Sequence, residues 1–289
     1  MNAGAIGLGL AFALMWSSAF TSARVIVEYA PPMASLSLRF LISGLIGVGL
    51  ALALGQSFRL SRAQWKATVI FGVCQNALYL GLYFVAMQTI EASLASIFAS
   101  TMPLMVALAG WAIFRDRLPR LAVAGLVLGI IGVVLIMGAR VGTGVDPFGV
   151  TLCIIGAVAL TVATLSVRGA SSGGNVMMIV GLQMLVGSAC LAVPAAMLET
   201  IEVTLSWQLV VAFVYTTLVP GLAATWVWFT LVNRIGAVKA ATFHFLNPFF
   251  GVAIAAALLG ERLGMLDVIG VAVIAAGILA VQLSKQKPT

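Results

Sequence analysis

Four polar and aromatic side chains in the apolar run at residues 66–88 form the first set that could bind a ligand. They recur at three- and four-residue spacing, so a helix would carry them on one face: Gln75, Asn76, Tyr79 and Tyr83. Amide and phenol groups can hydrogen-bond a polar ligand, and tyrosine rings can stack on an apolar one. The alternative is a stripe that joins neighbouring helices by hydrogen bonds. The tyrosines among apolar neighbours favour the wall of a ligand cavity.

Two ionisable side chains also lie inside apolar runs. His244 is the only histidine, and Asn247 follows it one turn later. The histidine could bind a carboxylate or carry a proton, or it could be neutral and bonded to a neighbouring helix. Arg39 could hold a substrate carboxylate or satisfy carbonyl groups at a helix end. The sequence leaves these alternatives open.

Hydroxyl and indole groups add further candidates. Ser96 lies four residues before Ser100, and either could bind a ligand or simply allow close helix packing. Trp226 and Trp228 are two residues apart and would point about 160° from each other on a helix, so at most one faces a ligand. We take Trp226 and, from the first apolar run, Trp16 as the aromatic candidates.

Prolines inside apolar runs mark places where a helix can bend. Pro103 and Pro248 each remove a backbone hydrogen bond and would free the carbonyl one turn earlier, at Ala99 and His244. Such a kink can shape a gate or remain a static bend. Pro220 and Gly221 are adjacent, and this pair permits a broken or hinged helix. We predict hinge positions at Pro103, Pro220, Gly221 and Pro248.

Other kinds of chemistry find no support in the sequence. No Asp or Glu lies in the interior of an apolar run, so the usual handle for a cationic ligand and the usual proton carrier are absent. There is no phosphate-binding loop, no cluster with metal-ligand spacing and no serine–histidine–acid set. We therefore predict that the chain is not an enzyme and that it binds no metal or cofactor.

The composition requires a membrane environment. The 289 residues are 62% hydrophobic and only 8% charged, which is far below the usual charged fraction of soluble domains. Spans in lipid must be helical because each has to satisfy its own backbone polar groups. We predict an all-α integral membrane protein with ten transmembrane helices, at about 4–23, 33–54, 66–88, 92–114, 119–138, 148–167, 175–198, 207–231, 237–259 and 265–284.

The basic residues set the expected orientation. They are scattered among the loops rather than gathered in a patch, which speaks against nucleic-acid binding. Most lie on the side that would hold both termini: Arg59, Arg62, Lys66, Arg115, Arg117, Arg120, Arg168, Arg234, Lys239, Lys285 and Lys287. Arg24, Arg140 and Arg262 would lie on the opposite side. The positive-inside rule therefore predicts cytoplasmic termini in a bacterial-type inner membrane.

The two halves of the chain are related. Residues 91–138 match residues 236–283 without a gap, and the identical pairs include Ala92/Ala237, Phe98/Phe243, Pro103/Pro248, Arg117/Arg262, Gly125/Gly270 and Gly132/Gly277. Each half holds five predicted spans, an odd number, so the second half would enter the membrane upside down. We predict two inverted five-helix repeats, at 1–144 and 145–289, an organisation that many carriers use to open alternately to each face.

These residues resemble a known family. The resemblance is carried by Trp16-Ser17-Ser18-Ala19-Phe20, Pro32, Arg39-Phe40, Ala92 and Ser96 before Pro103, and the span exits Arg115-Asp116-Arg117-Leu118 and Gly260-Glu261-Arg262-Leu263. The chain is similar to the paired EamA domains of the drug/metabolite transporter superfamily, and most similar to aromatic amino-acid exporters of the YddG type. The resemblance implies a ten-helix inverted-repeat carrier with a central cavity lined mainly by spans one, three, four, six, eight and nine.

Together these observations predict a secondary transporter that exports neutral amino acids, aromatic and other large ones, by alternating access. Without an intramembrane acid we expect facilitated diffusion or loosely coupled exchange. The predicted substrate contacts are Trp16, Gln75, Asn76, Tyr79, Tyr83, Ser96, Trp226, His244 and Asn247. The alternatives are a carrier of nucleobases, nucleosides or organic anions and, from another class, a membrane-embedded enzyme or a non-transporting subunit.

Overall fold

In the described part of the chain, ten helical stretches are long and apolar enough to cross a membrane. The computed structural model describes residues 3–141, 144–166 and 174–285; Arg168 and Lys287, which entered the predicted orientation, lie outside them. In the described part every regular element is a helix. The membrane-spanning stretches are Ala3–Tyr29, Pro32–Ala53, Arg62–Ala86, Ala92–Phe114, Arg120–Ala139, Pro147–Ser166, Val176–Leu198, Trp207–Ile235, Lys239–Leu259 and Met265–Ser284. The predicted all-α fold with ten spans is confirmed.

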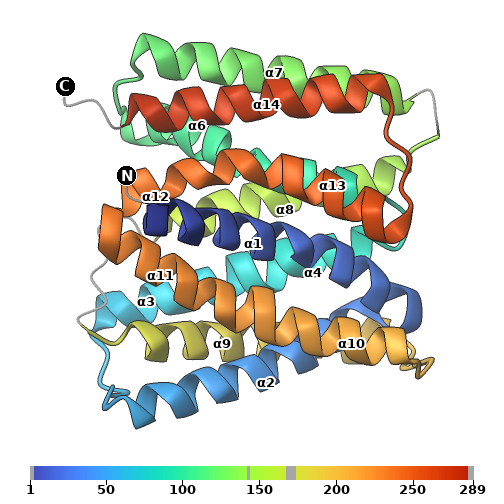
Figure 1. Cartoon of the computed structure of the whole chain (residues 1–289). Coiled ribbons are helices and arrows are strands. Elements are labelled where there is room, and N and C mark those ends of the chain that lie inside the picture. Colours follow the sequence, from blue (N-terminus) through green and yellow to red (C-terminus); the bar gives the residue numbers. More distant parts are fainter. Residues whose placement is uncertain (1–2, 142–143, 167–173, 286–289) are drawn as a thin grey trace. The chain divides into compact units, whose positions relative to one another are not determined.

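Six spans are single helices and four are interrupted (Figure 1). The single helices are α1 (Ala3–Tyr29), α2 (Pro32–Ala53), α7 (Arg120–Val141), α8 (Pro147–Ser166), α9 (Val176–Leu198) and α14 (Met265–Ser284). The third span joins α3 (Arg62–Phe71), π-helical η1 (Gly72–Tyr79) and α4 (Leu80–Ala86), and the fourth joins α5 (Ala92–Ser100) and α6 (Met102–Phe114). The eighth joins α10 (Trp207–Thr216), π-helical η2 (Thr217–Ala223) and α11 (Ala224–Ile235). The ninth joins α12 (Ala237–Ala241), 3₁₀-helical η3 (Thr242–Leu246) and α13 (Asn247–Leu259).

The described chain divides into two compact units. The first comprises the chain up to Thr21, Ile90–Val150 and the part from Ala223 onward. The second comprises Ser22–Thr89 and Thr151–Leu222. Each unit therefore takes helices from both predicted repeats.

In the first unit, glycines let α7 and α14 pack with their backbones almost touching. A β-carbon at Gly125 would lie 2.6 Å from the Gly277 carbonyl oxygen, and one at Gly132 would lie 2.8 Å from the Gly270 oxygen. The contacts run in opposite directions along the two helices, so the pair is antiparallel. They are also reciprocal, because Gly270 and Gly277 are the repeat counterparts of Gly125 and Gly132. Reciprocal contacts are what a local two-fold relation produces, and they are consistent with the inverted repeat.

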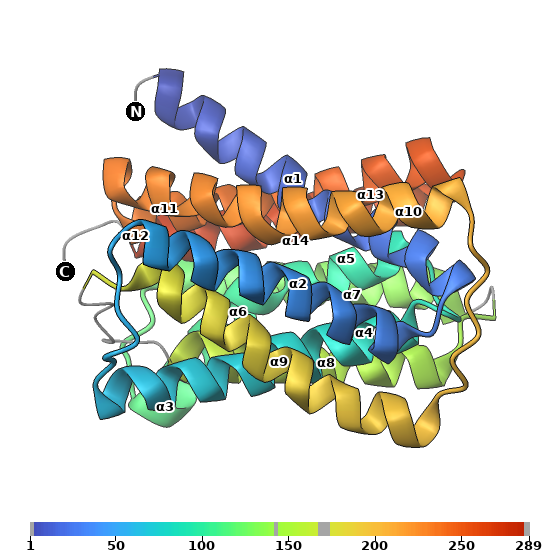
Figure 2. The same cartoon turned by 90° about the horizontal axis from the view of Figure 1, so that it is seen from below.

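The second unit contains an antiparallel pair of the same kind, α2 and α9, which lie side by side in Figures 1 and 2. Ser37 bonds to Ser188, and its hydroxyl donates to the Ser188 carbonyl at 2.9 Å. Farther along, a β-carbon at Gly44 would lie 3.0 Å from the Gly181 carbonyl oxygen. Small residues again permit the close approach of two helices that lipid alone would not drive together.

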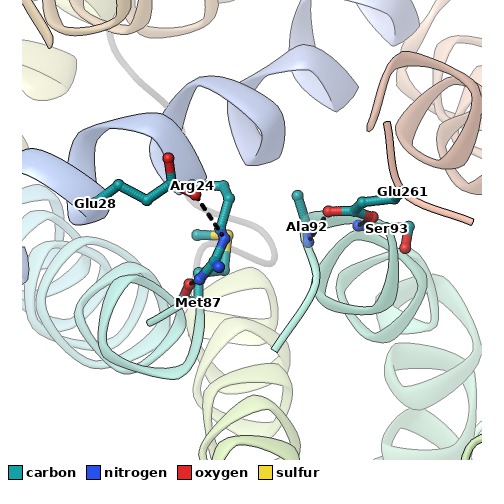
Figure 3. Close-up of polar contacts among 6 residues, drawn as sticks. All are labelled: Arg24, Glu28, Met87, Ala92, Ser93 and Glu261. Atoms are coloured by element: carbon teal, nitrogen blue, oxygen red, sulfur yellow. Dashed lines mark hydrogen bonds and ion pairs between the residues drawn. The ribbon is translucent and has the colours of Figure 1, made fainter. Parts of the chain in front are cut away.

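Charged side chains cap two of the helix ends (Figure 3). The Glu261 carboxylate accepts from the backbone N–H groups of Ala92 and Ser93, at 2.7 and 3.0 Å, at the start of α5. At the end of α4, Arg24 donates to the Met87 carbonyl and pairs with Glu28, with 3.4 Å between Nε and Oε1. These groups satisfy backbone donors and acceptors that a helix end leaves open.

Candidate functional site: an aromatic cluster around a histidine

In the first unit, three aromatic rings surround the half-buried imidazole of His244. The centroid of the Phe12 ring lies 5.4 Å from that of the imidazole, with the two planes at 89°. The Trp16 ring lies 6.3 Å away, also at 89°, and the Trp228 ring lies 5.4 Å away at 56°. Distances and tilts of this kind are the favoured ones for aromatic pairs. We call these four side chains the aromatic cluster.

Asn247 fixes which imidazole nitrogen carries the proton. Its side-chain Nδ2 lies 3.0 Å from His244 Nδ1. An amide nitrogen can only donate, so Nδ1 accepts and the proton of the neutral ring is on Nε2. In the part of the chain that the structure describes, this Nε2–H makes no hydrogen bond. A free donor is therefore available beside three aromatic rings.

Small side chains hold the helix that carries Asn247. The Ser17 hydroxyl donates to the Asn247 backbone carbonyl at 3.1 Å, which joins α1 to α13. One turn farther along α13, Gly251 packs against Ser96 of α5 so closely that a β-carbon there would lie 1.8 Å from the Ser96 Oγ. Only glycine fits at that position.

Three buried polar atoms near these contacts have no hydrogen-bond partner among the residues that the structure describes. They are Asn247 Oδ1, Ser93 Oγ and Ser96 Oγ. A buried polar atom that stays unsatisfied costs about 1–3 kcal/mol. Proteins retain such a cost where a ligand or water supplies the missing partner, so these atoms mark a candidate binding site.

A break in the ninth span presents His244 to the rings. The chain forms 3₁₀ helix η3 before Pro248, which lies at the start of α13, where proline is tolerated. The His244 carbonyl, predicted to be free, accepts the backbone N–H of Asn247 instead. The repeat counterpart Pro103 likewise begins a helix, α6, directly after α5 ends at Ser100.

The two tryptophans of the eighth span have different surroundings, as their spacing of two residues predicts. Trp228 packs against His244 and against Phe12, whose ring centroid is 4.7 Å from its own. Trp226 is 61% exposed. We therefore replace Trp226 by Trp228 in the site that we propose below. Phe12 was missed as well, although it lies one helical turn before Trp16.

The span-three stripe lies in the second unit. Asn76, Tyr79 and Tyr83 are buried and Gln75 is half-buried. The Asn76 amide donates to the Gln183 carbonyl of α9 at 2.8 Å, which is the interhelical alternative for this residue. The two tyrosine rings pack on each other with centroids 4.6 Å apart. Both Asn76 and Tyr79 belong to η1, whose wider π-helical turn was not foreseen.

The predicted hinge Pro220-Gly221 lies within the second π-helical segment, η2. Segments of this kind interrupt a helix where a sequence is locally strained or functional. Among the residues that the structure describes, no group of three or more His, Cys, Asp or Glu side chains could hold a metal ion.

Several known proteins are similar to this chain in sequence. An uncharacterized transporter of Bacillus subtilis, YvbV, is 26% identical over 272 residues, covering 93% of this chain and 88% of YvbV. A probable amino-acid metabolite efflux pump of Salmonella typhimurium is 24% identical over 94% of this chain and 92% of the pump. An aromatic amino acid exporter, YddG of Ancylobacter novellus, is 30% identical over 135 residues, 47% of this chain and 46% of the exporter.

A solved crystal structure shares the fold, with a TM-score of 0.71 and 20% identity over 99% of this chain and all of that one. The model of the EamA-like transporter family matches residues 3–138 and again residues 147–283. The chain therefore belongs to the EamA-like transporter family.

Proposed function

We propose that this transporter exports amino acids with aromatic or other large neutral side chains. The observation that carries the proposal is the aromatic cluster with its free His244 Nε2–H and the unpartnered Asn247 Oδ1 beside it. An amino acid has an apolar part that suits aromatic rings, a carboxylate that accepts hydrogen bonds and an ammonium that donates them. The cluster and Asn247 together offer a complement for each.

The roles follow from the hydrogen-bonding capacity of each group. The Nε2–H of His244 donates to the substrate carboxylate, and Asn247 Oδ1 accepts from the substrate ammonium. The rings of Trp16, Trp228 and Phe12 cover the side chain. The hydroxyl of Ser96 can serve either charged end. Neutral groups on the protein favour a zwitterion over a cation or a dianion, because no net charge then remains unbalanced in the membrane.

The mechanism that we propose is alternating access without tight proton coupling. The interruptions at Pro103, at Pro248 and at Pro220-Gly221 are the positions where the spans can bend, since the regular helical bonding already changes there. The acids of the described spans lie at their ends, with Glu28 in the last turn of α1 and Asp267 in the first turn of α14. They are therefore poorly placed to carry protons through the membrane.

Counterflow in proteoliposomes tests the proposal. Vesicles loaded with unlabelled phenylalanine should accumulate labelled phenylalanine or methionine from outside, and Trp228→Ala should reduce the rate. Absence of counterflow with every large neutral amino acid would overturn the substrate assignment. Accumulation that requires an imposed pH gradient would overturn the uncoupled mechanism.

We also propose that both termini lie in the cytoplasm of a bacterial-type cell, with the protein in the inner membrane. The support is the clustering of basic residues in the loops that follow the even-numbered spans and at the C-terminus. A fluorescent protein that folds only in the cytoplasm, fused after residue 289, should be bright. Activity of a periplasm-dependent alkaline phosphatase fused at the same point would contradict this orientation.

A further inference from the structure

Arg39 of α2 is a buried cation that has no counter-charge among the described residues. Only 6% of the residue is exposed, and its guanidinium stacks on the Phe40 ring at 4.9 Å from the centroid. Its Nε is buried without a hydrogen-bond partner, and none of the described carboxylates forms an ion pair with it. An isolated charge in a low-dielectric interior is expensive unless hydrogen-bonded acceptors compensate it.

A second orphaned group lies one turn farther along α2. The Ser43 side chain is fully buried, and its hydroxyl also has no hydrogen-bond partner in the described part of the chain. Both groups adjoin Gly221 of η2. A β-carbon at Gly221 would lie 3.1 Å from the Thr216 carbonyl oxygen, 3.6 Å from Arg39 Nη2 and 3.7 Å from Ser43 Oγ. A charged donor and a hydroxyl thus converge at the side-chain-free position of Gly221, within the second unit.

We propose that Arg39 and Ser43 bind a carboxylate beside Gly221. A planar guanidinium can present two parallel N–H donors to the two oxygens of a carboxylate, and the Ser43 hydroxyl adds a third donor. One guanidinium balances one negative charge, which favours a carboxylate over a phosphate dianion. The ligand supplies an acceptor to Arg39 Nε and to the Ser43 hydroxyl, which have none among the described residues.

This site does not depend on the amino-acid transport proposed above, because it is defined by binding alone. The carboxylate can belong to a free organic acid or to the α-carboxylate of an amino acid. Both sources present the same carboxylate group to the site. Three probes of similar size distinguish the two sources: 3-phenylpropionate, L-phenylalanine and L-phenylalanine methyl ester.

The test is a titration of the purified full chain in detergent at constant ionic strength, with the melting temperature followed by tryptophan fluorescence. We expect 3-phenylpropionate to raise the melting temperature in a saturable way. Arg39→Gln should weaken the apparent affinity about tenfold or more, as expected for loss of a charge-assisted hydrogen bond. Arg59→Gln, which removes the same charge from an exposed loop residue, should leave the affinity unchanged.

If Arg39→Gln does not fold, two further variants test the proposed carboxylate site. Arg39→Lys keeps the charge but loses the paired donors, and Gly221→Ala fills the space with a methyl group. Both variants should bind 3-phenylpropionate more weakly, and unchanged affinity in both would overturn the proposed site. Stabilisation by L-phenylalanine that Arg39→Lys also weakens would identify the amino acid as a source, and stabilisation by 3-phenylpropionate alone would identify a free acid. The proposal fails if the methyl ester stabilises equally well, if phosphate binds more tightly, or if no carboxylate stabilises the chain.

Discussion

The side-chain amide of Asn247 lies 3.0 Å from His244 Nδ1, and this contact turns the imidazole into a donor of defined position. Both residues belong to the broken ninth span, three residues apart, with Pro248 directly after. The break sets the direction of the ring, and the amide sets its tautomer. A ligand would meet a donor that is already oriented.

Replacing Trp228 by alanine should weaken transport more than the same change at Trp226. Trp228 packs on both His244 and Phe12, whereas Trp226 is 61% exposed. A lost aromatic contact of about 1 kcal/mol corresponds to about a fivefold rise in KM for labelled phenylalanine. Counterflow rates of the two variants, at matched protein per vesicle, measure the difference. Equal effects at both positions would show that the substrate does not use the cluster.

Asn247→Leu should raise the KM for phenylalanine by about tenfold, because it removes the acceptor for the substrate ammonium and the donor to His244 Nδ1. Ser17→Ala is the comparison. In the described part of the chain its hydroxyl donates to the Asn247 backbone carbonyl and not to the side-chain amide, which therefore keeps its role. We expect a smaller change there. A larger loss in Ser17→Ala than in Asn247→Leu would mean that α13 placement, not the amide, governs binding.

Span number and type could be predicted because apolar run length is a direct consequence of bilayer thickness. The first span shows the limit of that signal. It was expected to end near residue 23, but α1 continues to Tyr29. Arg24 and Glu28 pair at i and i+4 along it, and Arg24 also caps α4. A helix can therefore extend beyond its apolar run where charged side chains form ion pairs or hydrogen bonds.

The candidate site was only partly predictable, for a geometric reason. Helix periodicity predicted that Trp226 and Trp228 point in different directions, but both have apolar neighbours. Nothing in the local sequence therefore indicated which of the two side chains meets His244. In span three, a 3.6-residue period was assumed across residues that form a π-helical turn. Asn76 then faces Gln183 of α9, a partner more than a hundred residues away. Such pairings follow from tertiary packing, which a single span does not encode.

Gly277→Ala should lower the melting temperature, whereas Gly138→Ala should not. A β-carbon at Gly277 would lie 2.6 Å from the Gly125 carbonyl oxygen, so α14 would have to move away from α7, at a cost of about 1–3 kcal/mol. At Gly138 of α7 a β-carbon has open space, and alanine favours the helix by about 0.5–1 kcal/mol. Thermal unfolding in detergent measures both. Equal melting temperatures would show that the α7–α14 contact tolerates separation.

Glu261→Gln should destabilise the protein through the start of α5. The native carboxylate accepts from two backbone N–H groups, those of Ala92 and Ser93, and its charge opposes the positive end of the helix dipole. The amide keeps one acceptor oxygen and loses the charge, so we expect a loss of about 1 kcal/mol in unfolding free energy. Glu202→Gln is the matched control, since Glu202 is exposed and shows no side-chain bond in the described part. Because α5 also carries Ser96, the same variant should slow counterflow. Full stability together with native counterflow would mean that α5 is anchored by its packing on α13 alone.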